Sequence, residues 1–130
     1  MERRFKMKKT KEISTFIFGA VLVFLMFYCV YPPLTYANPP QDIKLGYDLN
    51  SQTLTVTITH KSSFTGFHYV KYVEIKKNGI GIITETYDSQ PDPETFSYTY
   101  KVSAAKGDTL EVTATCNLSG NKTATLAVGK

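Results

Sequence analysis

Residues Thr53 to Lys77 read TLTVTITHKSSFTGFHYVKYVEIKK and contain two predicted β-strands joined by a loop. From Gln52 to His60 apolar residues alternate with threonines, which is the period of a half-buried antiparallel strand. His60 falls on the apolar face, so we predict that its imidazole lies at the inner rim of the strand. A second strand follows from His68 or Tyr69 to Lys77. Its apolar phase slips between Tyr72 and Val73, which indicates a β-bulge.

The same alternation with turn signals recurs along the chain after residue 38. Asn78-Gly79 is a strong hairpin signal because both residues tolerate positive φ. The proline-rich segment 88–93 cannot continue a sheet. Together with the two strands above, we predict strands over Asp42–Tyr47, Gly81–Tyr87, Thr95–Val102, Leu110–Cys116 and Lys122–Val128. Seven short strands without helical periodicity predict one all-β, immunoglobulin-like antiparallel β-sandwich. The chain has no tryptophan, so the Cys…Trp…Cys pattern of antibody domains is missing.

The inward positions of these strands define the expected hydrophobic core. The apolar side chains assigned to this core are in phase with the inner face of their strand. The predicted core residues are Leu54, Val56, Ile58, Val73, Ile75, Phe96, Tyr98, Leu110, Val112, Ala114 and Leu126.

The first 37 residues are predicted to be a targeting segment, and residues 38–130 the folded domain. A basic stretch precedes an apolar run from Ile13 to Val30, and Pro32-Pro33 ends it. Thr35-Tyr36-Ala37 offers a signal-peptidase site. The apolar run has about the shortest length that spans a bilayer, so an uncleaved N-terminal anchor is the alternative. In both cases the domain is expected on the outer side, secreted or anchored to the membrane. Lipidation at Cys29 is disfavoured by the bulky Tyr28.

Charge excludes one class of function for the domain. Six of the 15 Lys and Arg side chains and two of the 11 Asp and Glu side chains precede residue 38, which leaves nine of each sign. The domain is therefore neutral, and no basic patch is available for nucleic acid.

Three residues are candidates for a reactive centre. His60 and His68 are the only histidines, and Cys116 is the one cysteine after the targeting segment. His60 and Cys116 each occupy the last inward position of the second and sixth strands, which face one another in an immunoglobulin-like sandwich. His68 opens the third strand. Two imidazoles and a thiolate at one rim would suit a transition metal, whereas ordinary packing of a lone buried cysteine is the structural alternative.

A family resemblance extends this prediction. The stretch THKSSFTGFHYVKYVEIKKNG resembles the core of superoxide reductases, the iron domain of desulfoferrodoxin and neelaredoxin. Residues 109–120, TLEVTATCNLSG, are similar to the family's terminal Cys-Asn-Leu-His-Gly element. The resemblance runs from about Pro40 to Val128. It implies a seven-stranded immunoglobulin-like sandwich that holds a non-haem ferrous ion and reduces superoxide to peroxide.

The resemblance also implies a ligand set, and the chain departs from part of it. In the family, four histidines in a plane and one axial cysteine hold the iron. His60 and His68 would be two equatorial ligands and Cys116 the axial thiolate, which donates electron density to the metal. Ser119 stands at the position of the histidine in Cys-Asn-Leu-His-Gly, and the family's Glu-Lys-His loop has no counterpart. We therefore expect superoxide reduction to be weakened or lost.

Three classes of function follow from these observations. The first is a redox enzyme with a reduced iron site. The second is a metal protein without catalysis, with zinc completed by an outside ligand or with copper, although no methionine follows residue 38 to serve as the axial ligand of blue copper. The third is a metal-free surface or adhesion module, which the threonine-rich outer faces also fit.

Overall fold

The computed structural model describes residues 17–23 and 38–130. The chain divides into two units, Met1–Thr35 and Tyr36–Lys130. Residues 17–23 form a short helix in the first unit. Among the described residues, no helix has the length and apolar character needed to cross a membrane. The predicted signal-peptidase site and the boundary after residue 37 lie outside the described residues, as does most of the predicted apolar run.

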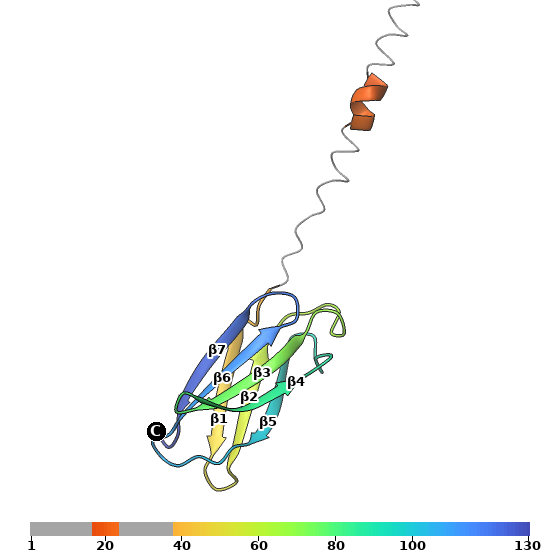
Figure 1. Ribbon diagram of the computed structural model, residues 1–130. Coiled ribbons are helices and arrows are strands. Elements are labelled where there is room, and N and C mark those ends of the chain that lie inside the picture. Colours follow the sequence, from red (N-terminus) through yellow and green to blue (C-terminus); the bar gives the residue numbers. More distant parts are fainter. Residues whose placement is uncertain (1–16, 24–37) are drawn as a thin grey trace, which may run out of the picture. The chain divides into compact units, whose positions relative to one another are not determined.

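The second unit is a β-sandwich of seven strands in two antiparallel sheets, as the sequence predicts (Figure 1). One sheet has the order β1-β2-β5 and the other the order β4-β3-β6-β7. The strands are β1 (Asp42–Asp48), β2 (Thr53–Thr59), β3 (Val70–Lys77), β4 (Ile80–Thr86), β5 (Thr95–Lys101), β6 (Thr109–Cys116) and β7 (Asn121–Ala127). Each begins and ends within about two residues of its predicted bounds, the usual uncertainty of such assignments.

The alternation in β2 directs the apolar side chains into the core, as the sequence predicts. Leu54, Val56 and Ile58 are fully buried, while the threonines between them are half-buried. In β3 the register with β6 shifts between Val70 and Tyr72, which is the predicted irregularity. The shift lets Val70 and Val73 both point inward and leaves Tyr72 on the outside. The β3–β4 hairpin turns at Asn78 and Gly79, both with positive φ.

The core lies between the two sheets. Nine of the 11 predicted core residues are buried, whereas Tyr98 and Leu126 are only half-buried and pack against its edge. Tyr98 stacks on Tyr87, with ring centroids 4.2 Å apart, and the Tyr87 hydroxyl lies 2.8 Å from that of Tyr100. These tyrosines connect β5 of one sheet to the end of β4 in the other, so they close this side of the sandwich. The contact with Tyr87 gives the hydroxyl of the buried Tyr100 the polar partner that a buried phenol needs.

Candidate metal centre

His60, His68 and Cys116 reach one end of the sandwich from different elements. His60 directly follows β2, and its backbone N–H donates to the Glu94 carbonyl at 2.8 Å, which continues the pairing with β5 beyond the strand. Cys116 is the last residue of β6, in the opposite sheet. His68 lies in the β2–β3 loop, two residues before Val70, the register partner of Cys116. The strand order and the bulge in β3 therefore bring the three side chains to the same end.

The structure places these three side chains together. One potential ligand atom from each lies within 4.8 Å of the other two. The two imidazole rings meet edge to face, with centroids 4.5 Å apart and an angle of 75° between their planes. His60 is 0% exposed and Cys116 5% exposed, and His68 is half-buried. Among the described residues, Cys116 is the only free cysteine.

Gln90 determines which nitrogen of His60 carries its proton. The Gln90 amide nitrogen donates to the backbone carbonyls of His60 at 2.9 Å and of Asp92 at 2.8 Å. Its oxygen Oε1 is therefore an acceptor, and it lies 2.7 Å from His60 Nδ1. Because an amide oxygen cannot donate, Nδ1 must be protonated, and Nε2 of the neutral ring carries the free lone pair. Histidine ligands of metals are commonly oriented in this way by an acceptor behind the ring.

His68 has a buried nitrogen with no hydrogen-bond partner. Its Nε2 is the only buried side-chain nitrogen or oxygen among the described residues that lacks one. Burial lowers the pKa of His68, the adjacent His60 lowers it further, and a hydrogen bond to the Asn38 backbone opposes both. The neutral imidazole is thereby favoured, which is the form that binds metals. An unpartnered buried nitrogen is costly unless something binds to it.

Asn117, which directly follows Cys116 and β6, connects the end of this strand to the loop that carries His68. Its side-chain oxygen accepts from Tyr69 N–H at 2.9 Å, and its side-chain nitrogen donates to the Phe67 carbonyl at 2.9 Å. The hydroxyl of Ser62 donates to the His68 carbonyl from the other side of the loop. His68 is therefore positioned from both flanks, although the β2–β3 loop contains no regular structure.

The Cys116 sulfur receives polar contact from the turn that follows it. The backbone N–H of Leu118 lies 3.5 Å from Sγ and points towards it. The sulfur also lies 3.8 Å from Asn117 Oδ1. Ser119 is exposed in the same turn. Its side chain offers an alcohol and no imidazole.

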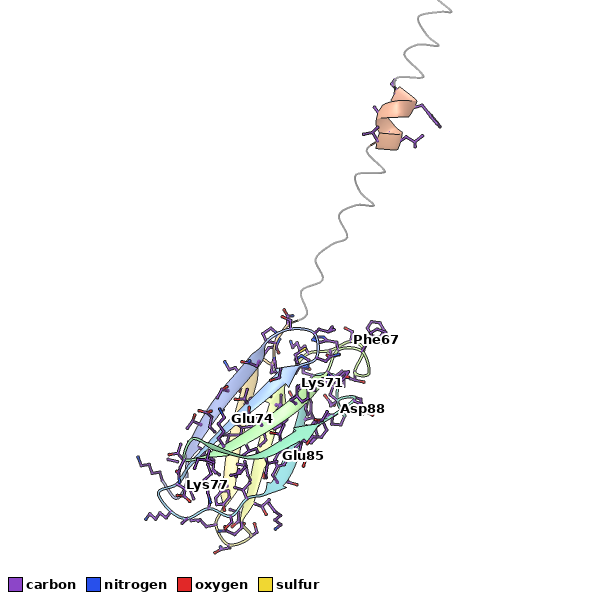
Figure 2. All side chains as sticks on the ribbon, viewed as in Figure 1. Phe67, Lys71, Glu74, Lys77, Glu85 and Asp88 are labelled. Atoms are coloured by element: carbon purple, nitrogen blue, oxygen red, sulfur yellow. The ribbon has the colours of Figure 1, made fainter. Side chains whose placement is uncertain are left out.

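The rim around the three residues is apolar. Phe64 and Phe67 in the β2–β3 loop are 76% and 82% exposed, and Leu118 in the β6–β7 turn is 60% exposed. Figure 2 shows Phe67 projecting from the loop at this end of the sandwich. None of these side chains packs in the core, and all three are exposed to solvent.

Gln90, Asn38 and Asn117 were not among the residues predicted for this site. Gln90 and Asn38 stand in proline-rich segments whose composition indicates only turns and linkers. Asn117 follows the candidate cysteine but has no pattern of its own. Tertiary contacts alone give these residues their roles, and a single sequence contains no signal for them.

Comparison with solved structures gives remote matches. Three structures of superoxide reductase (neelaredoxin) from Ignicoccus hospitalis, two of them of single-residue variants, are 16%, 15% and 16% identical to this chain. Their TM-scores are 0.45, 0.46 and 0.44. The alignments cover 71%, 69% and 70% of this chain and 79%, 80% and 79% of those chains. No family model and no curated protein matches the chain.

Proposed function

We propose that residues 38–130 form a mononuclear metal-binding domain in which His60, His68 and Cys116 hold the ion. One observation carries this proposal: three potential ligands lie within 4.8 Å of one another at the end of a rigid sandwich. The orphaned Nε2 of His68 fits a metal ligand, since a bound ion would supply its missing partner. The lone pair that Gln90 leaves on His60 Nε2 fits the same role.

Iron is the metal that we propose for this site. Imidazole and thiolate are ligands of first-row transition metals such as iron, zinc and copper. The sequence resemblance of residues 40–128 to superoxide reductases favours iron among them. Bound ferrous iron would supply one electron for the reduction of superoxide to peroxide. Cys116 would bind the metal as a thiolate, and Gln90 and Asn117 would hold the two imidazoles in place.

The proposed activity is slow compared with that of a complete five-ligand site. Three ligands are present, and Ser119 is a neutral alcohol that binds iron poorly. The domain is proposed to act outside the cytoplasm, secreted or tethered through the N-terminal segment, where extracellular superoxide would be the substrate. Its balanced charge, nine acids and nine lysines, leaves an anionic substrate without strong repulsion or steering.

Anaerobic loading followed by rapid mixing tests this function. The full chain, Cys116→Ala and Ser119→His are each loaded with ferrous iron, analysed for bound metal, and mixed with superoxide. We expect the parent to bind one iron per chain and consume superoxide slowly. Cys116→Ala is expected to lose both properties, and Ser119→His to consume superoxide faster.

Other results would contradict particular parts of the proposal. Iron binding by Cys116→Ala equal to that of the parent would exclude the three-residue site. A parent that binds zinc but no iron would leave the site standing without its redox function. If neither the parent nor any variant binds a metal, the result would favour a metal-free surface or adhesion module.

A further inference from the structure

A fourth donor atom lies beside the three candidate ligands. The backbone carbonyl oxygen of Asn38 is 3.1 Å from His60 Nε2. The His68 ring lies edge to face against that of His60, with centroids 4.5 Å apart. One oxygen at the start of the domain thus contacts His60 at the point where the two histidines meet.

The contact between Asn38 and His60 lacks a proton when the ring is neutral. Gln90 already fixes the proton of neutral His60 on Nδ1. Nε2 then directs a lone pair at a carbonyl oxygen, which also has only lone pairs. Two acceptors at 3.1 Å repel each other unless a positive charge lies between or beside them. With the Cys116 sulfur and a ring nitrogen of His68 close by, several electron-rich atoms lie together at this end of the sandwich.

The segment that carries this carbonyl is held firmly against the sandwich. Pro40 is buried, and Gln41 N–H donates to the Thr59 carbonyl at 2.8 Å. Pro39 packs on Gly120, where a Cβ atom would lie only 2.7 Å from the Pro39 Cβ. Gly120 has a φ of +72°, and its carbonyl accepts from Cys116 N–H at 3.0 Å. The turn that positions Cys116 therefore also provides the surface on which the Asn38–Pro40 segment rests.

We propose that the Asn38 carbonyl oxygen is the fourth protein ligand of the metal, so that the N-terminal linker completes the site. This inference rests on the proposed metal-binding function and specifies its coordination. The donor set becomes two imidazole nitrogens, one thiolate sulfur and one carbonyl oxygen. Four protein donors of these types suit a divalent transition metal, and a backbone oxygen is a known additional ligand beside two histidines and a cysteine in such sites.

An isotope-edited NMR titration tests the carbonyl directly. The sequence contains one Asn–Pro bond, Asn38–Pro39. The full chain in detergent micelles, labelled with carbonyl-¹³C asparagine and ¹⁵N proline, therefore gives a single carbon–nitrogen correlation from this bond. Zinc is the titrant, because it is diamagnetic. A second sample labelled with carbonyl-¹³C aspartate reports the single Asp–Pro bond, Asp92–Pro93, as the matched control.

The expected result is a change of the Asn38 carbonyl shift that saturates at one zinc per chain, with a smaller change at Asp92. If zinc binds and shifts the imidazole signals of His60 and His68 while the Asn38 carbonyl stays unchanged, the fourth ligand is excluded and the three-residue site stands. If zinc does not bind at all, the metal site fails and this inference fails with it.

A pair of glycine variants tests the linker independently. Gly120→Ala places a methyl group against Pro39, whereas Gly79→Ala adds one in open space at a similar positive φ of 81°. Both variants carry the same kind of backbone strain, so they differ in the displacement of the linker. Zinc affinity, measured by competition with a chelating dye, is expected to fall at least about tenfold more in Gly120→Ala. Equal affinities in the two variants would overturn the proposed role of the linker.

Discussion

At the scale of single residues, the site depends on how each histidine is held. The position of His60 follows from the alternation in β2, so its inward phase was predictable from the sequence. The proton on Nδ1 was not predictable, because Gln90 is 30 residues away in a loop that shows only turn chemistry. The same holds for His68, whose orientation depends on contacts from Asn117 and Ser62.

Replacing Gln90 is expected to weaken metal binding more than folding. In Gln90→Ala the acceptor behind His60 Nδ1 is lost, so the ring can rotate and either nitrogen can carry the proton. Loss of such an outer partner typically lowers metal affinity by about 10–100-fold. The measurement is a zinc competition titration of the full chain.

The matched control for this prediction is Gln52→Ala. Gln52 also donates to two backbone carbonyls, those of Leu49 and Ala104, but no contact connects it with the candidate ligands. We expect this variant to lose stability and keep its affinity for zinc. Equal affinities in Gln90→Ala and the parent would show that Gln90 does not position His60.

At the scale of the elements, the strands follow from the local pattern, whereas the loops do not. Period-two alternation and turn residues predict all seven strands to within about two residues. The phase slip in β3 correctly indicates a register shift, because Val70 and Val73 cannot both face inward in a regular strand. The course of the β2–β3 loop was not predictable, since it depends on backbone hydrogen bonds to the 88–93 segment, such as Ser62 N–H to the Pro93 carbonyl.

Truncating a buried side chain of β2 tests the predicted inward-facing positions through the loss of stability. Ile58 is fully buried between the sheets, so Ile58→Ala leaves a cavity and removes apolar contacts. We expect the free energy of unfolding to fall by about 2–4 kcal/mol. Thr99→Ala on the exposed face of β5 is the control, with an expected change within about 0.5 kcal/mol. Chemical denaturation measures both, and similar losses would mean that the inner and outer faces of the sandwich were misassigned.

At the scale of the whole molecule, the side chains of three aspartates form hydrogen bonds with the backbone of the turns and loops that connect the strands. Asp48, Asp92 and Asp108 each accept hydrogen bonds from backbone N–H groups, which lower the pKa of each carboxyl below its ordinary value of 3.8. These carboxylates stabilise the folded state at pH values above 3.8. Their contribution is lost as the pH falls through their lowered pKa values, because the unfolded chain then binds protons more readily.

Acid unfolding is therefore expected to depend on these three residues together. In the triple variant Asp48→Asn, Asp92→Asn, Asp108→Asn, the amide oxygens keep an acceptor but no longer titrate. The free energy of unfolding, measured by denaturant titration from about pH 5 to pH 2, should fall less steeply than in the parent. Identical slopes would show that the three carboxylates are not the source of the acid sensitivity.

The whole chain divides into an N-terminal unit and the unit that contains the sandwich. The sandwich closes around a core between opposed sheets, and this architecture brings His60 and Cys116 to one end, as their strand phases indicate. The targeting role of residues 1–37 and the location of the domain remain predictions from composition and charge. The contact made by the Asn38–Pro40 segment could not be predicted from the sequence pattern. The segment has the composition of a linker, yet its first carbonyl lies against His60.

X-ray absorption spectroscopy is the decisive test of the proposed metal centre, because it reports the atoms bound to the metal. The full chain is loaded with one equivalent of zinc and measured at the zinc edge, beside Cys116→Ala. We expect one sulfur at about 2.3 Å and nitrogen or oxygen neighbours at about 2.0–2.1 Å. The sulfur contribution should disappear in Cys116→Ala. A parent spectrum with no sulfur neighbour, or one unchanged by Cys116→Ala, would contradict a metal centre built from His60, His68 and Cys116.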